Sequence, residues 1–320
     1  MPAEQPAPNS QLHRGAPAKL PRPLRGIVPP MITPLRSRDE LDVPGLERLI
    51  EHILGGGVHG LFILGTSGEA PSLSYRLRRE LVVRACRQVA GRVPVLVGIT
   101  DTSFVEALHL AQHAAAAGAQ AVVTATPYYF PTGQPELLEF LERLLPELPL
   151  PVFLYNMPQM TKDQFELGTL RQVFQDERIA GIKDSSGNLE YFGQLLELKR
   201  QRPDLSLLVG PEHLLVETVR RGGDGGVNGG ANFHPRLLVT LFDAVIRQDT
   251  ARAEALQQEL LKMGAVYRVG HHASTVVKGM KCACSLLGLC DDFMAEPFHR
   301  FKTPEREKVR AILRECGLLP

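Results

Sequence analysis

The residues best suited to chemistry stand where apolar, strand-like segments of this sequence end. Lys183 follows the apolar run IAGI, and Tyr155 lies near the end of PVFLYN. The segment GLFIL leads directly into the turn GTSGEA, residues 65–70. A lysine at the end of a buried strand is costly because its charge must leave water. A functional role would explain why this position holds a lysine.

Lys183 is a candidate nucleophile. Desolvation in an apolar cavity lowers the pKa of a lysine and supplies some neutral amine near neutral pH. A neutral amine can attack a ketone and form a Schiff base, which then acts as an electron sink. The alternative is an ion pair with Asp184, the next residue. Because neighbours on a strand point to opposite faces, we expect Asp184 to lie outside the cavity.

Schiff-base chemistry also needs a proton carrier and a place for the substrate's charge. The hydroxyl of Tyr155, one predicted strand before Lys183, could exchange protons with the substrate, and a core tyrosine is the alternative. The turn GTSGEA offers backbone N–H groups and the hydroxyls of Thr66 and Ser67. Such a turn suits a small carboxylate or a phosphate, and an ordinary turn between strand and helix is the alternative.

The elements that must position these residues follow from a regular alternation of short β-rich runs and longer helical patterns. In RRELVVRACRQVA, for example, Leu81, Ala85 and Val89 recur at helical spacing. The strand candidates are GIVPPMI, GLFIL, PVLVGIT, AVVTAT, PVFLYN, IAGIK, LSLLVG and GGVNGG, the last of them weak by propensity. Eight such units over about 220 residues predict an α/β fold, a closed (β/α)8 TIM barrel, with a doubly wound sheet as the alternative. In such a barrel the active site lies at the carboxyl ends of the strands.

Three segments divide the chain. Residues 1–25 are rich in Pro, Ala and Gln and predict a disordered tail, with an organelle-targeting segment as the alternative. Residues 26–249 are the predicted barrel. Residues 250–320 contain about three further helical patterns and no clear strand, which predicts a C-terminal helical extension packed on the barrel and suited to subunit contact.

Composition excludes several classes of protein. The chain has 320 residues, 44% hydrophobic and 22% charged, and a formal net charge of +1, which gives no case for a nucleic-acid partner. No apolar run reaches membrane-spanning length. Five cysteines in a chain of this size do not form a disulfide framework, so a reducing compartment such as the cytoplasm is expected.

Metal binding is not predicted. Cys282, Cys284 and Cys290 do not have the spacing of a zinc site and lie in an apolar helical pattern. Cys86 falls on the apolar face of another helix, which predicts a core position. The pair His271-His272 is interpreted as an exposed pair on a helix or loop rather than as ligands.

Taken together, the segments GTSGEA, TPYYFP, LYNMP and GIKDSSG resemble the dihydrodipicolinate synthase / N-acetylneuraminate lyase family of class I, pyruvate-dependent aldolases, in the family's order and approximate spacing. GGDGGVNGGAN resembles the family's glycine-rich eighth strand, and the resemblance covers about residues 24–317. It implies that Lys183 is the Schiff-base lysine and Tyr155 the general acid and base. It also implies a reaction without metal or cofactor, because the imine itself is the electron sink.

The resemblance implies further roles for single positions. Thr66 matches a member of the proton relay, and Ser67, with Gly68 in the same turn, matches the part that holds the pyruvate carboxylate. Val227 matches the position whose backbone carbonyl faces the Schiff base. Tyr129 matches a tyrosine that reaches into the neighbouring subunit's site, which implies a homo-oligomer, usually a tetramer built as a dimer of dimers.

Departures from the family pattern bear on the second substrate. The lysine-biosynthesis branch holds the aldehyde's carboxylate with an arginine, and Met160 stands at that position, which weakens dihydrodipicolinate synthesis. The N-acetylneuraminate branch tolerates an apolar residue there and places two acids after the glycine of strand seven. In this chain Gly210 is followed by proline and then by Glu212 and His213, so Glu212 could contact a polyol chain while His213 departs from the second acid.

The leading hypothesis is therefore a lyase that forms a Schiff base on Lys183 and joins or separates pyruvate and an aldehyde, as an N-acetylneuraminate lyase-like enzyme or a 2-keto-3-deoxy sugar-acid aldolase. The enzyme alternatives are 4-hydroxy-tetrahydrodipicolinate synthase, a related 2-keto-acid dehydratase, and a phosphate-binding isomerase barrel that would leave Lys183 and Tyr155 unexplained. The remaining alternative is a catalytically silent paralogue that acts as a binding protein.

Overall fold

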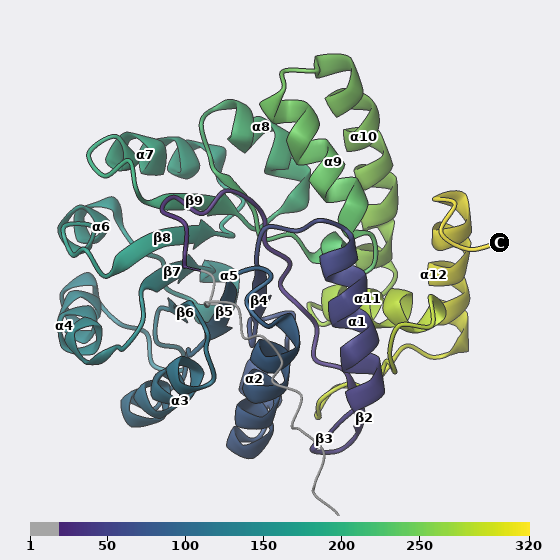
Figure 1. The fold of residues 1–320 in the computed structure, drawn as a ribbon, viewed down its shortest axis with the longest axis horizontal. Helices are drawn as coiled ribbons and strands as arrows, with labels where there is room; N and C mark the ends of the chain where they lie inside the picture. The colour runs from purple at the N-terminus through teal and green to yellow at the C-terminus, as the bar shows by residue number, and fades with distance from the viewer. Residues whose placement is uncertain (1–18) are drawn as a thin grey trace, which may run out of the picture.

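Eight parallel strands form the centre of the computed structural model, which describes residues 19–320 (Figure 1). The strands are β1 (Gly26–Ile27), β4 (Leu61–Ile63), β5 (Val95–Gly98), β6 (Ala121–Ala125), β7 (Val152–Asn156), β8 (Ile179–Asp184), β9 (Ser206–Val209) and β10 (Gly225–Gly226). Their order in the sheet is β1-β10-β9-β8-β7-β6-β5-β4. The predicted segments therefore all contain a strand of this sheet.

The sheet closes on itself between its first and last strands. Pro30, just beyond β1, forms a parallel bridge with Phe62 of β4. The Phe62 N–H donates to the Pro29 carbonyl at 2.9 Å, and the Met31 N–H donates to the Phe62 carbonyl at 2.8 Å. This closure confirms the TIM barrel and contradicts the doubly wound alternative, which would leave two open edges.

Helices surround the strands on the outside (Figure 1). Those of the barrel are α1 (Val43–Gly55), α2 (Tyr75–Val89), α3 (Phe104–Ala116), α4 (Gln134–Leu144), α5 (Pro158–Thr161), α6 (Leu167–Val173), α7 (Leu189–Lys199), α8 (Leu215–Arg220) and α9 (Pro235–Ile246). In α2, Ser74 caps the first turn by accepting from the Leu77 N–H, and Leu81, Ala85 and Val89 form the buried face as predicted.

Two apolar layers hold the barrel together. One fills the interior of the barrel with side chains such as Phe62, Phe153 and Tyr155. The other lies between the strands and the helices and includes Val152 and Leu154 of the same strand β7. Alternate residues of β7 thus point in opposite directions, which is the period of two expected of a strand.

The short strand β10 depends on glycine. Gly225 has φ of +147°, and a Cβ at this position would lie 2.0 Å from the Gly26 carbonyl oxygen of β1. A side chain would therefore separate β10 from β1. GGVNGG has a low strand propensity because it contains glycine where the backbones of β10 and β1 approach closely.

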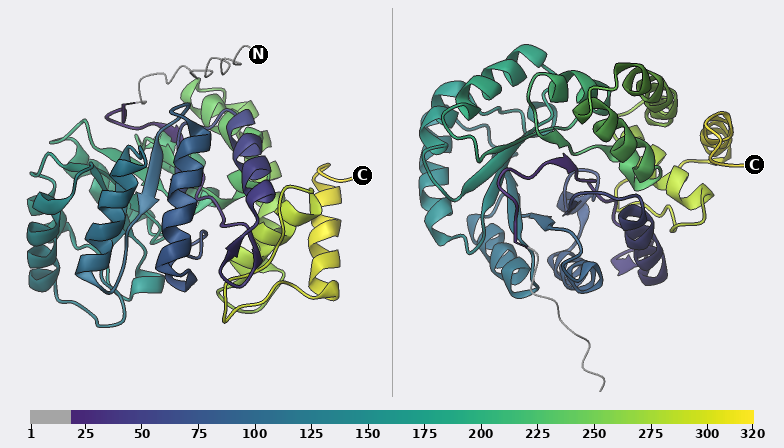
Figure 2. Two further views of the ribbon diagram at one scale, coloured as in Figure 1. Left: turned by 60° about the horizontal axis from the view of Figure 1, so that its bottom comes forward. Right: turned by 45° about the horizontal axis from the view of Figure 1, so that its top comes forward.

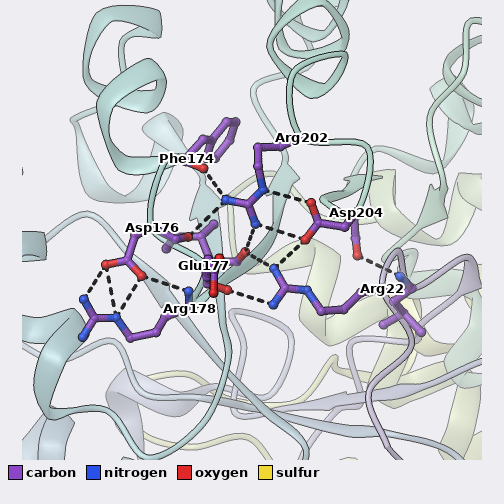
Figure 3. Close-up of polar contacts among 10 residues, drawn as sticks. Arg22, Phe174, Asp176, Glu177, Arg178, Arg202 and Asp204 are labelled. Atoms are coloured by element: carbon purple, nitrogen blue, oxygen red, sulfur yellow. Dashed lines mark hydrogen bonds and ion pairs between the residues drawn. The ribbon is translucent and has the colours of Figure 1, made fainter.

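Residues 22–25 are part of the fold, although the sequence predicted a disordered tail up to residue 25. Leu24 is buried in the interior layer, and its N–H donates to Ser206 Oγ at 2.8 Å. Arg22 forms an ion pair with Asp204 and donates to the Ile179 carbonyl at 2.7 Å, within a network of charged side chains at the amino ends of β8 and β9 (Figure 3). The predicted tail is therefore wrong for residues 22–25, which close the bottom of the barrel, and its residues 1–18 lie outside the described residues.

The segment after the barrel folds into α10 (Thr250–Met263), α11 (Thr275–Leu286) and α12 (Thr303–Glu315). Figure 2 shows α11 beside α1, with α12 outermost. Hydrogen bonds from Arg48 Nε to the Leu289 carbonyl and from the Asp291 N–H to Asp42 Oδ2 join the two regions. A small hairpin of β2 (Leu35–Ser37) and β3 (Glu40–Leu41), absent from the sequence prediction, precedes α1.

Across residues 19–320 no helix has both the length and the apolar character needed to cross a membrane.

Candidate active site

Lys183 and Tyr155 lie side by side inside the mouth of the barrel. They are register partners on the adjacent strands β8 and β7, so both side chains point inward. Lys183 Nζ lies 4.0 Å from the centre of the Tyr155 ring and 5.2 Å from that of Phe62. Each of the two site residues is only 6% exposed. The amine is thus enclosed by aromatic faces, an arrangement that removes it from water.

Asp184 points away from this amine, as predicted. Its carboxylate accepts from Asn156 Nδ2 at 2.8 Å and from Ser186 Oγ at 2.9 Å, on the outer side of the barrel. Burial raises the pKa of Asp184, and the hydrogen bonds from Asn156 and Ser186 oppose that shift. The structural alternative for Lys183, an ion pair with its neighbour, is therefore wrong.

Tyr155 is connected to the turn after β4. Its hydroxyl lies 3.3 Å from Thr66 Oγ1. Burial raises the pKa of Tyr155, but the charge of Lys183 and the hydroxyls of Thr66 and Ser185 outweigh it, so that the net pKa is lowered. A phenol with a lowered pKa exchanges protons more readily near neutral pH, which suits a general acid and base.

The turn GTSGEA is held in an unusual backbone conformation. Leu64 and Glu69, at its two ends, have φ of 58° and 56° although neither is glycine. The Gly68 carbonyl accepts from Thr33 Oγ1 at 2.7 Å, and backbone atoms at 3.1 to 3.3 Å surround the place of its missing Cβ. Ser67 is partly exposed between them. Left-handed residues of this kind persist only where surrounding contacts impose them, and they cluster at functional sites.

A cavity of about 340 Å³ opens in front of Tyr155 and Thr66. Its walls are largely apolar and include Met157, Met160 and Phe62. Hydroxyl groups also line it, from Ser72, Thr100, Tyr128, Thr161 and Ser274. No lysine or arginine belongs to the lining that the described residues form, but Lys183 Nζ lies close to the rings of Tyr155 and Phe62, which both line the cavity. The cavity can hold a small molecule beside the amine.

The C-terminal extension forms one wall of this cavity. Val277 of α11 lines it, together with Met294 and Phe298 from the segment between α11 and α12. The sequence predicted only that the extension packs on the barrel. Its part in the site depends on contacts between residues more than 200 positions apart and has no local sequence signal.

A larger hollow of about 950 Å³ lies on the outside of the barrel and is lined by residues of α1 and α2 such as Glu47, Arg79 and Arg84. It is open and lacks the buried nucleophile and the tyrosine. Volume alone therefore does not select the candidate active site, and the buried amine beside Tyr155 favours the smaller cavity.

Glu212 does not line the cavity, and its predicted contact with a polyol chain is wrong for this structure. Its Oε2 accepts from the Gly230 N–H at 2.8 Å, and the carboxylate faces the buried Tyr267. Burial raises the pKa of Glu212 to about 7, and the Gly230 N–H and Tyr267 oppose the shift. Gly210 has no room for a side chain, since a Cβ would lie 1.9 Å from Ser185 Oγ.

Two tyrosines follow β6, and they point in different directions. Tyr128 lines the cavity, a role the sequence prediction did not assign, whereas Tyr129 is 84% exposed with φ of 84°. Tyr129 therefore contributes nothing to the site of its own chain, and its contact with a second copy stays a prediction. The side chain of Val227 belongs to the interior layer of the barrel.

The remaining candidates lie outside the site. Cys86 and Cys282 are buried in the helical layer, and burial raises the pKa of each thiol to about 12. Cys284 is buried on the same helix as Cys282. His271 and His272 are exposed in the loop before α11, as interpreted from the sequence.

Comparison with known proteins gives a consistent picture. A sequence model of the Dihydrodipicolinate synthetase family matches residues 23–316. The "Probable 2-dehydro-3-deoxy-D-pentonate aldolase YjhH" of Escherichia coli is 33% identical, over 92% of this chain and 98% of the relative. The structure of dihydrodipicolinate synthase from Bacteroides thetaiotaomicron is 52% identical, with a TM-score of 0.89 over 92% of this chain and 99% of that one. The structure of the Escherichia coli prophage protein YagE in complex with pyruvate is 30% identical, with a TM-score of 0.87 over 92% and 99% of the two chains.

Proposed function

The chain belongs to the dihydrodipicolinate synthetase family, whose members are class I lyases and aldolases, and from this premise we propose that it joins or separates pyruvate and an uncharged aldehyde through a Schiff base on Lys183. The observation that carries the proposal is the buried amine of Lys183, enclosed by Tyr155 and Phe62 beside a largely apolar cavity. The favoured substrate is a 2-keto-3-deoxy sugar acid, which would be cleaved to pyruvate and a short hydroxyaldehyde.

The proposed reaction begins with attack of the neutral Lys183 amine on the C2 carbonyl of the keto acid. Tyr155 donates a proton to the carbonyl oxygen, takes one back from the attacking nitrogen, and then donates it to the carbinolamine hydroxyl, which leaves as water and yields the protonated imine. Thr66 exchanges protons with Tyr155 over their 3.3 Å contact. Ser67 and the N–H groups of its turn hold the carboxylate.

In the cleavage direction, the C4 hydroxyl loses its proton to Tyr155 and the C3–C4 bond breaks. The electron pair moves into the protonated imine, which becomes an enamine, and the aldehyde leaves. Protonation at C3 and hydrolysis then release pyruvate and free Lys183. The imine is the electron sink throughout, so the proposed reaction needs no metal or organic cofactor.

The lining of the cavity supports an uncharged aldehyde. Met160, 45% exposed at its rim, cannot form the charge-assisted bond that a carboxylate-bearing aldehyde requires. The hydroxyl groups of Thr100, Tyr128 and Ser274 can donate to and accept from the hydroxyls of a short sugar. The printed name of YjhH, a sugar-acid aldolase, agrees with this choice. The position of Glu212 removes the support for an N-acetylneuraminate lyase-like polyol site.

A second candidate is 4-hydroxy-tetrahydrodipicolinate synthesis, which the name of the 52% identical Bacteroides thetaiotaomicron protein favours. It requires a cation for the carboxylate of the aldehyde, and Met160 stands where that cation is expected. We therefore place it second.

We also propose that the active form is a homo-oligomer. The exposed Tyr129 and Phe130 form an edge-to-face pair beyond β6, and an aromatic pair of this exposure is costly unless another surface covers it. Sedimentation of the Tyr129→Ser variant tests this, because loss of the contact would shift the protein toward smaller species.

The decisive experiment is intact mass after incubation with pyruvate and borohydride, on the wild-type protein and on Lys183→Ala. A single adduct in the wild type that is absent from the variant is expected. No adduct with any 2-keto acid would refute the Schiff base and favour a catalytically silent protein. Adducts only with longer keto acids would favour a dehydratase. Retro-aldol assays on 2-keto-3-deoxy acids, compared with condensation of pyruvate and aspartate semialdehyde, then separate the two candidate substrates.

A further inference from the structure

A second buried lysine lies close to the site but belongs to the C-terminal extension. Lys281 of α11 is fully buried, and its ammonium forms an ion pair with Glu69 at the end of the turn GTSGEA. Lys281 Nζ also donates to the Phe293 carbonyl at 2.6 Å. Its amine is thus surrounded by acceptors and has no access to the cavity, which excludes a role as a second nucleophile.

Glu69 is held from both sides of its carboxylate. Besides the ion pair, its Oε1 accepts from the Ala295 N–H at 2.8 Å. The Glu69 N–H donates to the Thr66 carbonyl at 3.1 Å, so the backbone of Glu69 closes the turn that presents Thr66 and Ser67. The left-handed conformation of Glu69, with φ of 56°, is unfavourable for a residue with a side chain and needs such contacts to persist.

The Glu69–Lys281 ion pair also contacts the segment that forms one wall of the cavity. Phe293 and Ala295, whose backbone groups contact Lys281 and Glu69, flank Met294, which lines the cavity. Burial lowers the pKa of Lys281, and the charge of Glu69 opposes the shift. One pair of charges therefore joins the turn expected to hold the keto acid's carboxylate to the segment that faces the aldehyde.

We propose that the Glu69–Lys281 ion pair is a positioning device that fixes the Thr66–Ser67 turn in the geometry required to bind the carboxylate of the 2-keto acid. The inference rests on the proposed function, since it assigns the turn to the keto acid. Neither Glu69 nor Lys281 contacts Lys183 or Tyr155 in the described contacts, so the pair acts through the turn, on carboxylate binding by Ser67 and on the position of Thr66 beside Tyr155.

Removal of one partner leaves the other as an uncompensated buried charge, and the turn must then rearrange to solvate it. A displacement of a positioning group by about 1 Å can cost up to about 100-fold in rate. Loss of binding that is equal in the ground and transition states raises KM and leaves kcat unchanged. Because the same turn carries Thr66, the expected signature is weaker saturation by pyruvate together with a lower rate of imine formation at saturation.

The test uses Lys281→Met, which keeps the length of the side chain and removes its charge, in the full-length protein. Timed borohydride trapping at increasing pyruvate gives the half-saturating concentration and the maximal rate of imine formation without an aldehyde. The double variant Glu69→Gln, Lys281→Met removes both charges, and glutamine keeps an acceptor for the Ala295 N–H. Lys199→Met is the matched control, because Lys199 forms an ion pair with Asp224 near the amino end of β9.

For Lys281→Met we expect the half-saturating pyruvate concentration to rise about tenfold or more, with a lower maximal rate of imine formation. The double variant should regain thermal stability and keep the raised half-saturation, and Lys199→Met should lose stability with unchanged half-saturation. If Lys281→Met does not fold, the double variant supplies the comparison. A folded variant lacking the ion pair whose half-saturation equals that of the wild type would overturn the inference. Absence of an adduct in the wild type would instead refute the proposed function.

Discussion

Substitution of Tyr155 by phenylalanine separates the chemistry of the site from its packing. The ring of Tyr155 lies edge-to-face against Phe62 at 6.4 Å between centres and supports the amine of Lys183 at 4.0 Å. Phenylalanine keeps both contacts and removes only the hydroxyl, whose contact with Thr66 is 3.3 Å long.

Two magnitudes are expected for Tyr155→Phe, one for stability and one for the rate of imine formation. Loss of one long hydrogen bond changes the free energy of unfolding by about 1 kcal/mol or less. Loss of the general acid and base lowers the rate of imine formation by about 10²- to 10⁴-fold. At about 1.4 kcal/mol for each factor of ten, this loss corresponds to about 3 to 5 kcal/mol in the activation free energy.

The assay is single-turnover imine formation with pyruvate, stopped by borohydride at timed intervals and followed by intact mass, with urea denaturation in parallel. Tyr191→Phe is the matched control, because Tyr191 is a buried tyrosine on α7 whose hydroxyl donates to the Phe165 carbonyl at 2.5 Å, outside the cavity. It should lose stability and keep its rate. A Tyr155→Phe variant that forms the imine within about threefold of the wild-type rate would refute the assignment of Tyr155 as proton carrier.

Three further perturbations test other parts of the molecule. Met160→Arg should raise kcat/KM for carboxylate-bearing aldehydes by about 3- to 10-fold, since the position is partly exposed, and unchanged selectivity would show that residue 160 does not face the aldehyde. Burial raises the pKa of Glu212 from 4.5 to about 7, so the folded state binds a proton more tightly than the unfolded state does. The protonated Glu212 therefore stabilises the folded state fully below pH 4.5, and this stabilisation is lost as the pH rises through 7. Glu212→Gln should therefore remove up to about 3 kcal/mol of this pH dependence, which melting curves between pH 4.5 and 8 would reveal as a flatter profile. Leu24→Ala should lower the free energy of unfolding by about 2 to 5 kcal/mol in urea titrations, and no loss would mean that residues 22–25 do not close the barrel.

The sequence alone predicted those features of the structure that depend on neighbouring residues and on the order of the strands. Strand alternation placed Lys183 inside and Asp184 outside, and the order of β and α segments predicted that Tyr155 would come from the neighbouring strand. These predictions held because a parallel barrel with regular repeats converts position along the chain into position in space. For GGVNGG the sequence predicted only a strand of weak propensity, and the close backbone contact at Gly225 became visible in the structure.

Other features depend on which residues the tertiary fold brings together. Tyr128 and Tyr129 are adjacent and chemically identical, yet Tyr128 lines the cavity while Tyr129, whose backbone is left-handed, is exposed. Glu212 follows the right strand, yet its carboxylate turns to the Gly230 N–H instead of the cavity. A buried carboxylate takes the nearest donor that the fold supplies, and sequence spacing does not reveal that donor.

The sequence thus predicted the barrel through periodicity, and it placed the candidate nucleophile Lys183 and the candidate proton carrier Tyr155 at strand ends. Only the tertiary structure decided what surrounds them. The pair of Glu69 and Lys281 lies 212 positions apart, and Leu24 reaches Ser206 across 182. Such contacts form because an apolar interior excludes water and forces buried charges and N–H groups to find partners wherever the closed barrel places them.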